Sequence, residues 1–270
     1  MRDLLNLLGI LFAYAAYAFG VRRSVTYENL RLAYPELATD DINILTKKTY
    51  RNLGIVFAEM LYLRFASKNK IESQIHVTNP EVFHEADRFG KGLIVVAGHI
   101  SNWEWLALGG ALVLKKNFFV VQKNIRTSFT DGFLQRMRVR SGNSLINSGD
   151  IRKMYRTLSL EGCIAMLADQ AAPSESAQIS FFGRPTPTFE GPARLALRTR
   201  APLLFAECTR TIDSQYSVTF SPVEFGDLQN DSTDNINLLT ARHTALLESS
   251  IRKHPDQWLW QHRRWKYSQS

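Results

Sequence analysis

The chain has 270 residues, of which 45% are hydrophobic and 21% are charged, and it carries a formal net charge of +8. This length and composition exclude a disordered chain and allow one α/β domain with a full core. The positive charge predicts an anionic partner, for which nucleic acid, anionic lipid and a phosphorylated substrate are all candidates.

The N-terminal segment is uncharged from Leu4 to Val21 and is followed by Arg22 and Arg23. A bilayer core needs about 20 apolar residues, with about 17 as the lower limit. We therefore expect residues 1–22 to form a hydrophobic membrane helix and residues 23–270 to form the folded domain. A buried or interfacial helix is the alternative. The arginine pair favours a cytoplasmic location for everything that follows it.

The next predicted elements are two helices. Apolar residues recur at helical spacing from Asp41 to Phe65, and most of the basic residues of this segment fall on other faces. Such a helix lies either on anionic lipid or over a sheet, and both interpretations stay open. Residues Pro80–Phe89 are predicted to form a short helix that leads into a strand.

Strands and helices then alternate through most of the chain. The pattern predicts strands at 93–97, 117–121, 145–146, 163–167, 203–207 and 216–221. It predicts helices at 103–114, 128–140, 150–160 and 235–253, and a further helix that starts at Pro192. This alternation is typical of the α/β class. We expect a single domain with a largely parallel or mixed central sheet flanked by helices.

The most informative stretch is Gly98–Glu104, which follows the apolar strand Leu93–Ala97. His99 would stand at the strand end, where α/β sheets place reactive groups, and Gly98 is expected to leave open space beside it. Glu104 lies about one and a half helical turns further on and is expected to orient the ring. A structural histidine is the alternative. The spacing does not fit a His-Glu-x-x-His metal site.

Two further polar groups are candidate substrate contacts. Asp169 and Gln170 end the strand at 163–167, so in a parallel sheet they would share an edge with His99 and could position a polar head group. Arg194 follows a helix start at Gly191-Pro192, where unpaired N–H groups and the helix dipole favour an anion. An ordinary loop cap and a solubilising arginine set are the respective alternatives.

The C-terminal segment 254–266 mixes Trp258, Trp260 and Trp265 with basic residues. That mixture suits a membrane interface or a phosphate-contacting surface, and the alternative is that the tryptophans close the core. The cysteines, Cys163 and Cys208, both lie in apolar surroundings. They are expected to be buried free thiols, which excludes a thiolate zinc site.

Five segments taken together resemble the late lipid A acyltransferase family, the lauroyl/myristoyl-type branch of the lysophospholipid acyltransferases. They read GHISNWE, ADQ, FFGRPTPT, GPARLALRTRAP and HPDQWLWQHRRWK, and the resemblance extends from about Tyr27 onward. GHISNWE resembles the family's His-x4-Glu signature, with His99 and Glu104 in the catalytic positions. One departure is that Gln122-Lys123 stands where the family usually has an arginine after the second strand.

The resemblance implies transfer of a fatty acyl chain from an acyl-carrier-protein thioester to a hydroxyl of a phosphorylated glycolipid, a lipid A precursor. It also implies a location on the cytoplasmic face of a bacterial inner membrane, and no metal or organic cofactor. His99 would be the general base, with Asn102, Asp169, Gln170 and Arg194 as substrate-binding residues.

Other functions stay open at this point. An acyltransferase acting on a glycerolipid, a phosphatidylinositol mannoside or an aminolipid is the nearest alternative. Glycerolipid acyltransferases typically show Asn-His-x4-Asp, whereas Gly98 precedes His99 here and the acid is Glu104. A nucleic-acid-binding protein would explain the charge but would give His99 no role, so no nucleic acid partner is expected. A catalytically silent membrane scaffold would not need the His99 and Glu104 pair.

Overall fold

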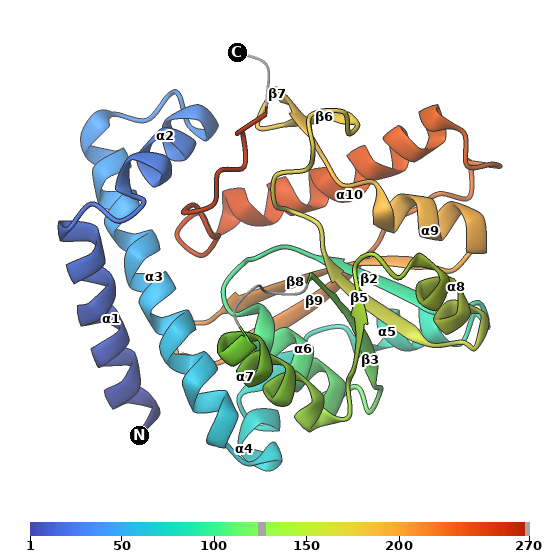
Figure 1. The fold of residues 1–270 in the computed structure, drawn as a ribbon, viewed down its shortest axis with the longest axis horizontal. Coiled ribbons are helices and arrows are strands. Elements are labelled where there is room, and N and C mark those ends of the chain that lie inside the picture. The colour runs from blue at the N-terminus through green and yellow to red at the C-terminus, as the bar shows by residue number, and fades with distance from the viewer. Residues whose placement is uncertain (124–127, 268–270) are drawn as a thin grey trace.

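The computed structural model describes residues 1–123 and 128–267 and has a central seven-stranded sheet with helices on both faces (Figure 1). The strands of this sheet are β1 (Ile75–Val77), β2 (Leu93–Ala97), β3 (Phe118–Gln122), β4 (Ser144–Asn147), β5 (Cys163–Leu167), β8 (Leu203–Arg210) and β9 (Tyr216–Pro222). Their spatial order is β1-β9-β8-β2-β5-β3-β4.

The sheet is mixed. Strands β8, β2, β5, β3 and β4 are mutually parallel, whereas β9 pairs antiparallel with β8 and parallel with β1. The predicted α/β domain with a largely parallel sheet is therefore confirmed. Because β2 is central and lies between β5 and β8, the carboxyl ends of these three strands meet at one edge of the sheet.

Helices cover both faces of the sheet. They are α4 (Lys68–Glu72), α5 (Pro80–Asp87), α6 (Trp103–Val113), α7 (Ser128–Arg138), the 3-10 turn Val139–Ser141, α8 (Ile151–Ser159), α9 (Gly191–Thr199) and α10 (Thr233–Lys253). Each predicted helix is present, and the ends differ by a few residues. The strand β1 and the helices α2 (Arg23–Ala33) and α4 were not predicted.

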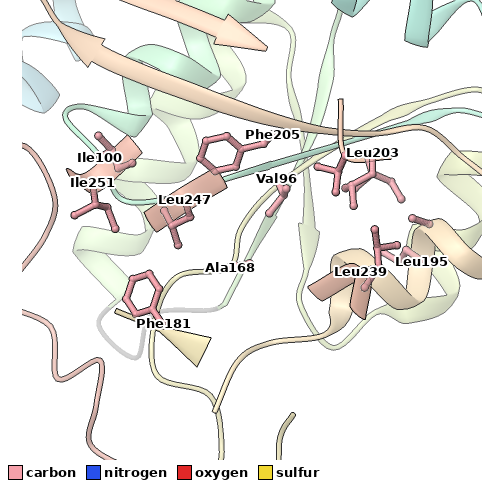
Figure 2. Close-up of a cluster of buried hydrophobic side chains, with 14 of the residues drawn as sticks. Val96, Ile100, Ala168, Phe181, Leu195, Leu203, Phe205, Leu239, Leu247 and Ile251 are labelled. Atoms are coloured by element: carbon pink, nitrogen blue, oxygen red, sulfur yellow. The ribbon is translucent and has the colours of Figure 1, made fainter. Parts of the chain in front are cut away.

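Successive side chains of β2 pack into two hydrophobic cores, one on each face of the sheet. Ile94 and Val96 pack in the core under α9 and α10, where Figure 2 shows Val96 near Phe205 and Leu247. Leu93 and Val95 pack in the core on the other face, which includes Trp105 of α6. Successive side chains of a strand point to opposite faces, so a strand buried on both sides needs the continuous apolar run that the sequence shows.

A two-stranded hairpin lies outside the main sheet, in a segment where no strand is predicted from the sequence. Its strands are β6 (Gln178–Phe181) and β7 (Arg184–Pro187), and they pair antiparallel. Phe182 and Gly183 form the connection with φ values of 53° and 71°. Positive φ at both central residues is the mark of a type I′ hairpin turn. Strand β7 contains two prolines, which are unfavourable in most strands, so the sequence pattern does not predict this short edge strand.

The C-terminal tryptophans and both cysteines belong to the core. Trp258, Trp260 and Trp265 are each at most 8% exposed, so the core interpretation of this segment is correct. Cys163 and Cys208 are buried free thiols, as predicted, and burial raises the pKa of both.

The N-terminal helix α1 (Arg2–Ala18) packs along the long helix α3 (Thr39–Phe65), and α2 joins the two at the top of the view in Figure 1. The two helices meet at Gly9 and Gly54, where a Cβ on Gly54 would lie 2.4 Å from the Gly9 carbonyl oxygen. Within the described residues no individual helix has the length and hydropathy of a bilayer span; α1 and α2 meet that criterion only as a pair, bent by 89°.

Candidate active site

His99 and Asp169 meet at the carboxyl edge of the sheet, because β2 and β5 are neighbouring parallel strands. The ring Nδ1 of His99 lies 2.6 Å from one carboxylate oxygen of Asp169. The backbone N–H of His99 donates to the other oxygen, also at 2.6 Å. The predicted shared edge is therefore confirmed, and Asp169 binds the histidine itself.

The surroundings of Asp169 keep its carboxylate charged. Burial alone would raise the pKa of Asp169, but the His99 ring, the His99 N–H and a 2.8 Å bond from the Trp258 indole N–H lower it to about 2. An ionised carboxylate can only accept hydrogen bonds, so the Nδ1 atom of His99 must carry the proton. When the ring is uncharged, the lone pair is therefore on Nε2.

His99 lines a narrow cavity that opens to solvent. Four residues of α3 line one side of it, namely Thr49, Asn52, Leu53 and Val56. Residues 257–259 and 261 line another side, and Trp103 packs edge-on against the ring with centroids 4.6 Å apart. The side chain of His99 is 15% exposed, so the ring is partly open to solvent.

The C-terminal segment holds the loop that carries His99. The Ser101 N–H donates to the Gln257 carbonyl at 2.6 Å, and the Leu259 N–H donates to the His99 carbonyl at 3.1 Å. Ser101 has a φ of 51°, a left-handed conformation that needs such support. Trp258 thus helps to build the site, a role that the sequence analysis missed.

Glu104 does not orient the His99 ring, which corrects the expected contact. Its carboxylate, only 1% exposed, is bound by the Arg138 guanidinium of α7, including an Nε bond of 3.0 Å. Arg138 also donates from Nη1 to the Gln122 side chain at 2.7 Å. The reason is positional: Asp169 already occupies the Nδ1 side of the ring. Arg138 therefore holds a cation beside Gln122, at the end of β3.

Asn102 has a structural position behind the site. It is buried at the N-terminus of α6, where its side-chain oxygen caps the N–H groups of Glu104 and Trp105. Its amide donates to the buried Glu59 of α3 at 3.2 Å. The structure thus gives Asn102 a helix cap in place of the expected substrate contact.

The other two expected substrate contacts lie in different environments. The Gln170 amide lies 3.5 Å from Nε2 of His99, so Gln170 is at the site. Arg194 is not brought to the site. Its side chain is 47% exposed on α9 and forms an ion pair with Glu190 one helical turn earlier.

Gly98 is required for close packing and not for open space, contrary to expectation. A Cβ there would lie 2.5 Å from a methyl carbon of Leu247 and 3.2 Å from a carboxylate oxygen of Asp169. In the portion of the chain that the structure describes, no group of three His, Cys, Asp or Glu side chains is placed to hold a metal ion.

Comparisons with known proteins identify the family of the chain. The model of a family described as bacterial lipid A biosynthesis acyltransferase matches residues 1–267. A lipid A biosynthesis palmitoleoyltransferase of Escherichia coli (strain K12) is 24% identical over 249 residues, covering 91% of this chain and 79% of that protein. A lipid A biosynthesis acyltransferase of Haemophilus influenzae is 25% identical over 251 residues, covering 91% and 78% respectively.

Proposed function

Because the chain belongs to the bacterial lipid A biosynthesis acyltransferase family, and so is an O-acyltransferase, we propose that it moves a fatty acyl group from an acyl-carrier-protein thioester to a hydroxyl of a lipid A precursor. The observation that carries the chemistry is the His99 ring, which the ionised Asp169 holds through Nδ1 at the border of a narrow cavity.

The reaction needs a base for the attacking alcohol. As the acceptor oxygen bonds to the thioester carbonyl carbon, its proton passes to Nε2 of His99. The resulting imidazolium is stabilised by Asp169 through the Nδ1 hydrogen bond. When the C–S bond breaks, the imidazolium returns the proton to the departing thiolate. No acyl-enzyme intermediate is needed in this scheme.

Glu104 and Arg138 have a supporting role in the proposal. A buried carboxylate that binds two nitrogens of one guanidinium fixes its orientation. The Arg138 cation is thereby held at the carboxyl end of β3, where Gln122 is the last residue. We assign it to an anionic group of the bound lipid or to the developing oxyanion.

The partners and the location follow from charge and family. A net charge of +8 favours an acidic carrier protein, a phosphorylated glycolipid and an anionic membrane surface. We place the enzyme at the bacterial inner membrane, with the catalytic domain on the cytoplasmic face, where acyl-carrier-protein thioesters are made.

The test is to incubate the purified chain with a lipid A precursor and with acyl-carrier-protein thioesters that differ in acyl chain length. The masses of the lipid products are then measured by mass spectrometry. One added ester-linked acyl chain is expected, and His99→Ala should abolish it. An unchanged precursor, together with acylation of a glycerolipid offered in parallel, would instead assign a different acceptor to the same site.

A further inference from the structure

Helices α1 and α3 expose apolar side chains that the protein itself leaves uncovered. Leu4, Leu8 and Leu11 lie on one stripe of α1, and Phe57, Leu61 and Phe65 recur every fourth residue on α3. All six side chains are between 50% and 73% exposed. We call these six residues the N-terminal apolar face. Figure 1 shows α1 and α3 side by side at the end of the molecule opposite α8.

Contacts at both ends hold α1 in place against α3. Arg2, at the start of α1, reaches Glu59, and the Tyr17 ring near its end lies 5.3 Å from the Tyr50 ring. Between them, Gly9 and Gly54 bring the two backbones into direct contact. The helices are therefore antiparallel and closely packed, and α1 is part of the domain surface.

The Arg2 side chain is buried among polar partners of the catalytic domain. Its guanidinium is 10% exposed and donates to the fully buried Glu59 at 2.6 and 2.8 Å, and also to Gln74 at 2.6 Å. It lies 5.3 Å from the centre of the Trp105 ring. If α1 left the domain to cross a bilayer, Glu59 would keep its hydrogen bonds from Asn102 and Tyr216 but would lose its counter-charge, which is unfavourable for a buried carboxylate.

Basic side chains border the apolar face at both ends. Arg22 and Arg23 follow α1, whereas Arg64 lies in the last turn of α3 and Lys68 begins α4. Among the residues that the structure describes, these four are in no ion pair. An apolar stripe with cations at its margins matches an anionic lipid leaflet, because the cations meet phosphates while the leucines and phenylalanines enter the acyl region.

The same helix connects this face to the catalytic cavity. Leu53 and Val56 of α3 line the cavity beside His99, and Phe57 follows directly on the exposed side. A lipid held at the apolar face would therefore need to move only across α3 to bring its head group to His99.

We propose that α1 and α3 together form an in-plane membrane-binding face that enters one leaflet of an anionic bilayer, and that α1 does not cross it. Arg2 and His99 then lie on the same side of the membrane. This inference rests on the membrane location in the proposed function, but it is independent of the chemistry at His99.

The first test places single cysteines on the full chain in living cells. Cys163 and Cys208 are buried, so an impermeant maleimide should leave them unlabelled. Asp3→Cys, at the exposed start of α1, is compared with Glu175→Cys, an exposed position of the catalytic domain. In sealed spheroplasts both should stay unlabelled, and both should react once the membrane is opened. Labelling of Asp3→Cys alone in sealed spheroplasts would show that α1 crosses the bilayer and would overturn the proposal.

The second test measures flotation of the purified protein with vesicles of phosphatidylethanolamine and phosphatidylglycerol. Leu8→Glu combined with Leu11→Glu should weaken vesicle binding by at least about tenfold. Leu160→Glu, which is 71% exposed beyond α8, is the matched control and should leave binding unchanged. Equal vesicle binding by the wild type, the double variant and Leu160→Glu would contradict a lipid partner. A concentration-dependent dimer that forms in the wild type and is lost only in the double variant would contradict it as well. The same variants are also assayed for acyl transfer to a detergent-dispersed acceptor, which needs no membrane binding. Loss of vesicle binding with retained transfer would concern only the membrane face, whereas loss of transfer by the wild type would concern the proposed chemistry.

Discussion

Asp169 binds His99 through both carboxylate oxygens, one to the ring Nδ1 and the other to the backbone N–H, each at 2.6 Å. The double contact fixes the ring relative to the chain that carries it. It also links the ends of two neighbouring strands, β2 and β5. The proton position on the imidazole is therefore set by the fold.

Replacing Asp169 by Asn should preserve the shape of the site and remove its charge. The neutral amide can donate to Nδ1, which would place the imidazole proton on Nε2 and remove the base. We expect kcat to fall by about 10²- to 10⁴-fold, the range seen when a histidine base loses its partner carboxylate. Asp87→Asn, which removes a surface partner of Lys116, is the control for a lost ion pair. A kcat for Asp169→Asn close to that of the wild type would show that the carboxylate does not act on His99.

The buried pair of Glu104 and Arg138 should behave as one unit in a double-mutant cycle. Arg138→Gln leaves the Glu104 carboxylate buried without a counter-charge and should lower the free energy of unfolding by about 3–5 kcal/mol. Adding Glu104→Gln should restore part of that loss. Denaturant unfolding provides the measurement. If Glu104 acted on His99 instead, Glu104→Gln would lower kcat equally with and without Arg138.

Acid should destabilise the fold through His243, a buried residue of α10. Burial lowers the pKa of this ring to about 4, against about 6.5 in an unfolded chain. Between these two pKa values the His243 ring is protonated in the unfolded state but not in the folded state. The free energy of unfolding therefore falls as the pH falls from 6.5 to 4. The loss amounts to about 3 kcal/mol. Between pH 6.5 and 4 the melting temperature of His243→Leu should depend less steeply on pH than that of the wild type. Identical slopes for the two proteins would contradict the lowered pKa of His243.

The contact between α1 and α3 should depend on the absence of a side chain at Gly54. Its Cβ would meet the Gly9 backbone at 2.4 Å, which no rotamer can relieve. Gly54→Ala should therefore lower the melting temperature and loosen α1. The matched control is Gly110→Ala in α6, where the nearest atom is 3.6 Å away and alanine should be neutral or add up to about 1 kcal/mol through helix propensity. Equal effects of the two substitutions on melting would argue against the close helix contact.

The sequence predicts the sheet well because its strands are apolar on both faces and its helices have clear starts. It does not reveal the partner of His99. Glu104 is close in sequence, whereas Asp169 lies 70 residues later and comes into contact only when β2 and β5 pair. Trp258 was missed for the same reason. Its indole N–H reaches Asp169 because the C-terminal segment returns to the loop after β2. The hairpin of β6 and β7 was missed because its prolines are unfavourable for strands.

The most direct test of the whole account is the rate of acyl transfer by His99→Ala, measured with a lipid A precursor and an acyl-carrier-protein thioester. The variant should be folded, with an unfolding transition close to that of the wild type, and kcat should fall by at least about a hundredfold. Transfer at the wild-type rate by a folded His99→Ala protein would contradict the assignment of His99 as the base.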